Sequence, residues 1–227
     1  MERGRALFRT TIGLKITMAL SGIVWVGFVI GHMLGNLKVY QGADAFNHYA
    51  EGLRVFGDPF LGREQGLWIA RIVLIAALVL HVWSAWKLSR RSQSARDVKY
   101  RRREAIEFSR ASRTMRWGGV ALLGFLVYHI LHFTTGTLHH DFVHGDAYHN
   151  FVAGFQLWYV AAIYAIAMVA LGLHLYHGTW SAFQTLGLGD GRDHGKRWHR
   201  QLALAVALVV VLGNLSFPVA VLTGLVS

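Results

Sequence analysis

The chain has 227 residues, of which 54% are hydrophobic, and its mean hydropathy is +0.36. A soluble domain of this length is usually less apolar, so the composition excludes an ordinary soluble globular protein. The formal net charge is +11, and the basic residues gather between apolar segments, which argues against a nucleic-acid partner. Because the chain has no cysteine, it cannot supply thiolate ligands to an iron–sulfur cluster.

Five long apolar runs follow one another along the chain. They predict membrane-spanning helices over about residues 12–37, 65–89, 115–138, 153–184 and 199–225. Each run reaches the roughly 18–20 residues that cross a ~30 Å hydrocarbon core. The two prolines, Pro59 and Pro218, leave the first four runs uninterrupted, so continuous helices can satisfy their own backbone hydrogen bonds. We therefore expect an all-α integral membrane protein, with residues 1–227 forming a single five-helix transmembrane domain.

Lysine and arginine are distributed unevenly about the predicted spans. Nineteen of the 23 lie before or within the first turns of span one, from Lys87 to Arg116 around the connection of spans two and three, or from Arg192 to Arg200 around the connection of spans four and five. The other four are Lys38, Arg54, Arg63 and Arg71. The positive-inside rule places the basic side, and with it the N-terminus, in the cytoplasm. No small-residue cleavage pattern follows the first run, so we expect it to remain as a span.

Histidines lie inside the predicted spans, where an ionisable side chain is costly and indicates function. Of the 13 in the chain, the intramembrane ones are His32, His81, His129, His132, His174 and His177. Spans one to four each carry one histidine past the midpoint: His32, His81, His129 and His174. Because successive spans run in opposite directions, His32 and His129 share a depth in the outer half of the membrane. His81 and His174 share a depth in the inner half.

The two depths predict two cofactor sites. In an up-and-down four-helix bundle, the first and third helices face each other diagonally, as do the second and fourth. Each histidine pair then crosses the interior at one depth, which suits bis-imidazole ligation of haem, with one ligand on each face of the macrocycle. A structural zinc site would instead need three or four ligands at one depth. The pattern favours an outer haem on His32 and His129, and an inner haem on His81 and His174.

Further residues near these sites are candidates for the haem periphery. His132 and His177 follow His129 and His174 by three residues, so spacing alone leaves open which member of each pair is the ligand. Arginine makes charge-assisted hydrogen bonds to carboxylates and could therefore pair with haem propionates. The candidates are Arg71 at the outer end of span two, and Arg113 and Arg116 at the inner start of span three.

Several motifs recur around these histidines. They are GHMLGN (31–36), GADAFNHYAE (42–51), VLHVWSAW (79–86), the segment from SRTMRWGG to YHILH (112–132) and LHLYHGTWSAFQTLG (173–187). In combination they resemble the di-haem cytochrome b membrane anchor of bacterial succinate dehydrogenases and fumarate reductases. The resemblance implies five helices, two haems b, and axial ligands at His32, His81, His129 and His174. It favours the first member of each pair and leaves His132 and His177 for contacts around the haem or with quinone.

The resemblance also implies a function in electron transfer. A flavoprotein subunit and an iron–sulfur subunit would bind on the cytoplasmic side of a bacterial inner membrane, and their electrons would pass through the two haems b to quinone in the lipid, expected to be menaquinone. Succinate chemistry would belong to those partners. Candidate quinone contacts are Lys15 and Ser21 near the inner side, and Glu51 and Glu64 near the outer side.

Alternatives remain within and outside this class. The chain could anchor a fumarate reductase or another quinone-linked dehydrogenase, and the complex could form a higher oligomer. A haem-free proton-coupled transporter that uses the buried histidines as a relay is the alternative from another class.

The segment LHHDFVHGDAYHN (138–150) holds four histidines and two aspartates. Membrane oxygenases with histidine boxes need several such sets converging at one face, whereas the other histidines here lie at other depths. We therefore expect a solvated outer loop that handles protons rather than a metal site.

Overall fold

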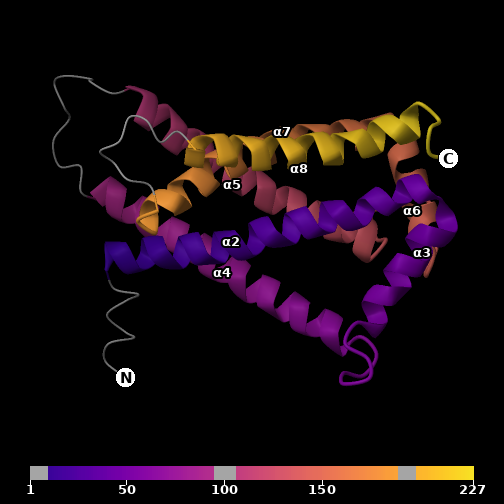
Figure 1. Ribbon diagram of the computed structural model, residues 1–227. Helices are drawn as coiled ribbons and strands as arrows, with labels where there is room; N and C mark the ends of the chain where they lie inside the picture. The colour runs from indigo at the N-terminus through magenta and orange to yellow at the C-terminus, as the bar shows by residue number, and fades with distance from the viewer. Residues whose placement is uncertain (1–9, 95–105, 189–197) are drawn as a thin grey trace.

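The computed structural model describes residues 10–94, 106–188 and 198–227, and over residues 106–114 it describes the backbone alone. These residues form helices joined by connecting turns, and the described part of the chain contains no strand. The long helices run beside one another, and the shorter α3 and α6 gather at one end (Figure 1). The prediction of an all-α protein is confirmed.

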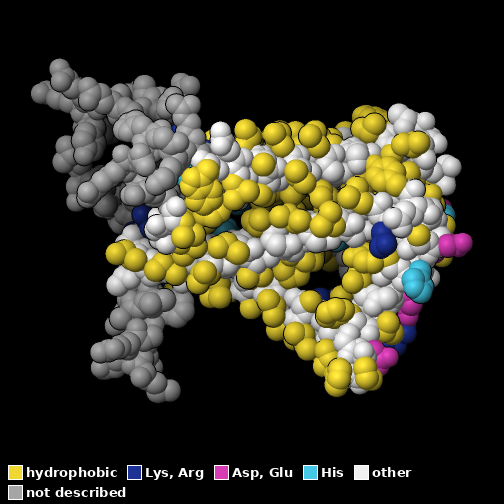
Figure 2. Space-filling model, in the orientation of Figure 1, with side chains coloured by type: hydrophobic (Ala, Val, Ile, Leu, Met, Phe, Trp, Pro, Cys, Tyr) yellow, Lys and Arg dark blue, Asp and Glu magenta, His cyan; other side chains and the backbone are white. Residues whose placement is uncertain are grey.

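Among the described residues, five helices are long and apolar enough to cross a membrane. They are α2 (Thr11–Asn36), α4 (Gln65–Ser94), α5 (Ile106–His129), α7 (Trp158–Thr185) and α8 (Trp198–Leu222). Hydrophobic side chains cover the flanks of the bundle in the view of Figure 2, and acidic side chains are seen near the α3 end. An apolar outer surface suits helices that are solvated by lipid. The prediction of five helices that can span a membrane is therefore confirmed.

The helices that carry the predicted ligands form an up-and-down bundle. Helix α2 packs against α4 and α7, and α5 packs against α7, so α2 is diagonal to α5 and α4 is diagonal to α7. Helix α8 packs along α7 outside this group of four. In the described chain, α4 makes its main helix contact with α2, and the two diverge toward the α3 end (Figure 1). The diagonal arrangement is the one predicted.

The region between the third and fourth spans differs from the prediction. The sequence predicts one span over 153–184, but two helices occupy this region: α6 (Ala147–Gln156) and α7, which begins at Trp158. Leu157, with φ −82° and ψ 109°, is extended and separates them. The predicted start is wrong because residues 150–155 of α6 are all buried within the protein. Hydropathy does not distinguish such a buried helix from the start of a span.

The third span also ends earlier than the predicted range of 115–138. Helix α5 ends at His129, and a π-helical turn, η3 (Ile130–Thr134), follows it directly. Beyond Thr135 the chain turns at Gly136, whose φ of 73° lies in the left-handed region that glycine adopts without strain. A π-turn changes the direction in which the following side chains point, and such turns are frequent at functional sites.

One end of the bundle is covered by segments outside the spans. This capped end consists of η1 (Leu37–Gln41), α3 (Ala43–Gly52), residues 135–146 and α6. Buried hydrophobic side chains, including Phe46 and Phe151, cluster here. Asn47 joins α3 to α6, because its amide donates to Asp146 (3.0 Å) and its side-chain oxygen accepts from the Tyr148 N–H (2.9 Å). The cap is therefore a packed part of the fold.

Candidate functional site

A cavity of about 1700 Å³ runs through the four-helix bundle. Most of its lining residues come from α2, α4, α5 and α7, with a few from α8 and with residues of α3 and α6 at the capped end. Figure 2 shows the molecule hollowed between α2 and α4, where Figure 1 shows these helices diverging. An ordinary small-molecule site has a volume of roughly 300–1,000 Å³, so this cavity can hold more than one large ligand. All four predicted axial histidines line it.

His32 and His129 lie together toward the capped end. Their ring centroids are 5.9 Å apart, and the ring planes make an angle of 86°. Nδ1 of His129 is 3.2 Å from the Tyr164 hydroxyl. Nε2 of His32 is 3.5 Å from the side-chain nitrogen of Asn36, which is the long limit of a hydrogen bond. The structure thus brings together the two histidines that were paired by their predicted depth.

His81 and His174 form the second pair, farther from the cap. Their ring centroids are 6.2 Å apart, with an angle of 59° between the planes. Nδ1 of His81 is 3.1 Å from the carbonyl oxygen of Met18. Because a carbonyl only accepts, Nδ1 carries the hydrogen and Nε2 keeps its lone pair for a metal. Nδ1 of His174 is buried without a hydrogen-bond partner in the described part of the chain.

His132 occupies a different environment from His129. It is 1% exposed and is absent from the cavity lining in the described chain. Its ring stacks on Tyr128 and His139, with centroid separations of 5.4 and 4.8 Å. Burial among these rings holds His132 away from the cavity, so His129 is the member of this pair that faces it.

On α7, a neighbouring ring distinguishes His174 from His177. Both His174 and His177 line the cavity, but His174 is the one whose ring lies beside His81. Nδ1 of His177 donates to the carbonyl oxygen of Leu173 at 3.0 Å, one turn back on the same helix. His177 is therefore placed at the wall of the cavity rather than opposite another imidazole.

Tyr164, on α7, is a functional candidate that the sequence patterns did not indicate. It is 7% exposed, and its hydroxyl oxygen is 3.2 Å from Nδ1 of His129 and 3.3 Å from Nδ1 of His132. A buried tyrosine hydroxyl usually finds a polar partner. A tyrosine inside an apolar run, on a helix that also carries a predicted ligand, is the signal that could have indicated it.

The three arginines predicted at the haem periphery lie in different places. Arg71 lines the cavity from α4, with its guanidinium 4.8 Å from the centroid of the Trp68 ring. Arg116 lines it from α5 and donates to Oγ of Ser89 at 3.2 Å. The side chain of Arg113 lies outside the described residues. Arg71 and Arg116 supply positive charge near opposite ends of the cavity, where each can meet a ligand carboxylate.

The four predicted quinone contacts do not form one group. Lys15 and Glu51 line the cavity near opposite ends. Ser21 is buried beside the inner pair, with Oγ 3.4 Å from Nδ1 of His81. Glu64, at the start of α4, has a φ of 66° and is outside the lining in the described chain. Only Ser21 therefore touches a predicted haem ligand.

Glu51 forms two ion pairs at the capped end. Its carboxylate oxygens lie 2.8 Å from the guanidinium of Arg54 and 2.6 Å from that of Arg63. The hydrogen bonds from Arg54 and Arg63 hold the pKa of Glu51 below its ordinary value. A carboxylate that stays ionised is a weak proton donor near neutral pH, so this geometry favours a structural role for Glu51.

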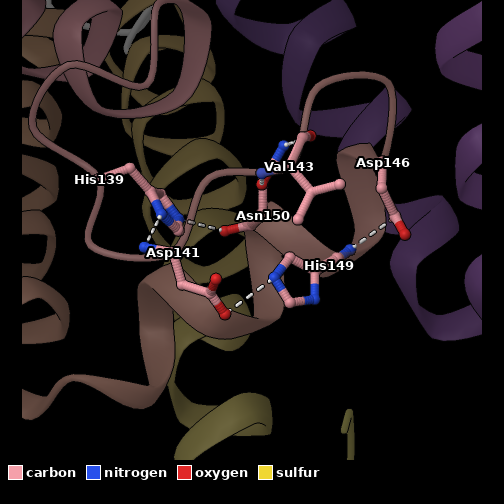
Figure 3. A network of polar contacts seen from close by, with 6 residues as sticks. All are labelled: His139, Asp141, Val143, Asp146, His149 and Asn150. Atoms are coloured by element: carbon pink, nitrogen blue, oxygen red, sulfur yellow. Dashed lines mark hydrogen bonds and ion pairs between the residues drawn. The ribbon is translucent and has the colours of Figure 1, made fainter.

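Residues 139–150 form a hydrogen-bonded network (Figure 3). The Asn150 side chain accepts from the Val143 N–H and donates to the Val143 carbonyl, both at 2.7 Å. His139 accepts at Nδ1 from the Asp141 N–H (3.1 Å) and lies with Nε2 at 2.8 Å from the Asn150 carbonyl oxygen, to which it donates. His149 lies 3.1 Å from the Asp141 carboxylate.

The predicted solvated loop is wrong for His139 and Asn150, which are buried. The physical reason is that a turn packed against helices must satisfy its backbone polar groups internally, and these two side chains supply the partners. His139 uses both ring nitrogens in this task.

The donor set of the cavity fits two haems. Two imidazoles bound to opposite sides of one metal atom, each through a bond of about 2 Å, have ring centroids roughly 6 Å apart. The observed separations of 5.9 and 6.2 Å agree with this spacing. Each pair combines residues from diagonal helices across a cavity with mainly apolar walls, as a flat macrocycle with two axial ligands requires.

Comparison with protein families gives one match. A family model described as "Succinate dehydrogenase/Fumarate reductase transmembrane subunit" matches residues 90–213. The matched segment is more than half of the chain and contains His129, His174 and Tyr164. Comparisons with curated proteins and with solved structures give no match.

Proposed function

We propose, because this chain belongs to the family of succinate dehydrogenase/fumarate reductase transmembrane subunits, that it anchors a flavoprotein and an iron–sulfur subunit and passes their electrons to membrane quinone. When bound, two haems b would supply one-electron carriage between those subunits and quinone. The observation that carries the proposal is the presence of two histidine pairs in one intramembrane cavity.

The four axial positions are assigned to these pairs. His32 and His129 would hold the haem nearer the cap, and His81 and His174 the other. The Met18 carbonyl supports the assignment of His81, because it holds the hydrogen on Nδ1 and leaves Nε2 available. His132 and His177 are assigned to the surroundings of the haems, since among the described residues neither ring faces a second imidazole across the cavity.

Arginine charges would neutralise the carboxylates of the cofactors. Arg71 and Arg116 line the cavity near opposite ends, which supports one guanidinium for each haem. Arg113 is assigned with Arg116 from its sequence position alone.

The uncapped end of the bundle is placed in the cytoplasm. It is the end at which α2 begins and α4 ends. There, 19 of the 23 lysines and arginines lie before α2 or in its first turns, from the last turns of α4 to the middle of α5, or from the end of α7 to the first turn of α8. The partner subunits would dock there and bring the iron–sulfur clusters, since this chain has no cysteine to ligate one. A bacterial inner membrane fits this orientation.

Quinone is placed toward the cytoplasmic end. Lys15 lines the cavity there, and Ser21 lies beside His81, so polar groups are available close to an electron-carrying site. Menaquinone is the quinone we expect.

Purification of the membrane complex through a tag on this chain tests the proposal. We expect two haems b per chain in a pyridine haemochrome assay and low-spin absorption spectra from the native complex. Succinate-dependent reduction of a quinone analogue should occur only when both partner subunits are present. A complex without haem would contradict the electron path and favour proton-coupled transport. Succinate oxidation by the chain alone would contradict its role as an anchor.

A further inference from the structure

The Tyr164 hydroxyl lies between two imidazole nitrogens, 3.2 Å from Nδ1 of His129 and 3.3 Å from Nδ1 of His132. We propose that Tyr164 is a positioning residue that accepts the Nδ1 hydrogen of His129 and thereby lowers the reduction potential of the haem that His129 binds. The inference rests on the proposed function, because it assigns a role in tuning one of the two haem sites.

The direction of the two hydrogen bonds follows from the chemistry of the groups. A histidine that binds metal through Nε2 carries its hydrogen on Nδ1, so His129 donates to the tyrosine oxygen. The hydroxyl hydrogen of Tyr164 is then free to be donated to Nδ1 of His132. The two bonds run in the same direction, and each polarises the other.

Packing holds this arrangement in place. Tyr164 is 7% exposed and His132 is 1% exposed. The His132 ring is stacked on the ring of His139, and His139 is itself fixed by the Asp141 N–H and the Asn150 carbonyl. The π-helical turn that begins at Ile130 places His132 in this cluster while His129 stays at the cavity. A continuous set of contacts therefore joins the ligand to the cap.

The second pair is supported differently among the described residues: the Ser21 hydroxyl lies 3.4 Å from Nδ1 of His81, farther than the main-chain oxygen of Met18 at 3.1 Å. Nδ1 of His81 faces the Met18 carbonyl, and Nδ1 of His174 has no hydrogen-bond partner in the described chain. Hydrogen bonding at Nδ1 makes an imidazole a more basic ligand, and a more basic ligand stabilises oxidised iron more than reduced iron. Removal of the Tyr164 hydroxyl should therefore raise the potential of one haem and leave the other unchanged.

The test is a redox titration of the purified complex, followed through the absorption of each haem b. Tyr164→Phe should shift the oxidised–reduced equilibrium of one haem about tenfold toward the reduced form, which is about 59 mV for one electron. His132→Phe keeps the ring stack but removes the acceptor for the tyrosine hydrogen, so the same haem should shift in the same direction by less.

Tyr128→Phe is the matched control. The Tyr128 ring belongs to the same cluster, while its hydroxyl makes no hydrogen bond among the described residues, so neither potential should move. Unchanged potentials in a Tyr164→Phe complex with both haems would overturn the proposal, as would equal shifts of both haems. Should Tyr164→Phe fail to retain the haem, His132→Phe decides by the same criterion. A wild-type complex without haem would instead contradict the proposed function itself.

Discussion

The two histidine pairs share one cavity, but they are supported in different ways. At the capped end, His129 is held by the side chain of Tyr164 within a cluster of aromatic rings. In the other pair, the nearest partner of His81 is a main-chain carbonyl of α2 at 3.1 Å, with the Ser21 hydroxyl farther away at 3.4 Å, and Nδ1 of His174 has no partner in the described chain. Side-chain partners change with a single substitution, whereas a main-chain partner is set by the fold. The capped site is therefore open to tuning by sequence, and the second site depends on helix packing.

Removal of one ligand should have the largest effect and should separate the two sites. We expect His32→Ala to lose the haem of the capped site and His81→Ala to lose the other, so each variant retains one haem of the two. The measurement is haem b per chain together with the midpoint potential that remains.

His177→Ala is the control for that experiment, because His177 lines the cavity and faces no other imidazole among the residues that the structure describes. It should keep both haems. Loss of the same redox species in His32→Ala and His81→Ala would show that the diagonal pairing is wrong.

Crowding the capped end should have the next largest effect. A Cβ at Gly154 would lie 3.0 Å from Cε1 of His132 and 3.1 Å from Nε2 of His139. Overpacking of this kind costs about 1–3 kcal/mol, so Gly154→Ala should lower the unfolding midpoint in detergent. Gly124→Ala is the matched control, since no atom of the described residues lies within 4 Å of its added Cβ. Equal midpoints for both variants would contradict tight packing at the cap.

Asn150→Ala should open the cap locally. It removes both side-chain hydrogen bonds to Val143. We expect a cost of roughly 1 kcal/mol, at the low end for unpaired groups, because Val143, whose backbone groups lose these bonds, is an exposed residue. Hydrogen exchange at the Val143 amide should accelerate several-fold. Asn150→Asp retains an acceptor for that amide, so its exchange rate should lie between those of wild type and Asn150→Ala.

The smallest expected effect is a pH dependence of hydrogen exchange at the start of α6. Hydrogen bonds from the His149 N–H and the Asn47 side chain hold the pKa of Asp146 below the ordinary value of 3.8. Because the pKa is lowered in the folded protein, ionised Asp146 stabilises the start of α6 fully at a pH above the ordinary pKa. This stabilisation is lost as the pH falls through the lowered pKa. Protection of the His149 amide, corrected for intrinsic exchange, should decline in that acidic range. Asp146→Asn should keep the helix cap but abolish the decline; a persistent decline would assign it to another group.

The sequence predicted the parts of the fold that hydropathy and helix direction determine. Five spans follow from apolar length, and the proximity of His32 to His129, and of His81 to His174, follows from their depth and from diagonal helices. The break at Leu157 could not be predicted, because α6 continues the apolar run of the span although it is buried in the cap. Burial against other helices and burial in lipid give the same hydropathy.

The hydrogen-bond partners of the predicted ligands could also not be predicted from sequence patterns. Tyr164 lies 35 residues after His129, and its contact with that ring depends on how α5 and α7 rotate about their axes. The π-turn at Ile130 changes the direction of His132, and no residue type marks it. Spacing therefore gave the depth of each histidine but not the partners of its second ring nitrogen.

Because α4 diverges from α2, a ligand in the cavity should contribute to the stability of the fold. In the described chain α4 has α2 as its main helical neighbour, and Leu74, Leu78 and other residues of its inner face line the cavity. A ligand that fills this space takes the place of a missing helix, and anything that binds only the folded state stabilises it by mass action. We therefore expect the chain to be degraded faster when that ligand is scarce. In its absence, proteolysis should begin at α4, before the capped end is lost.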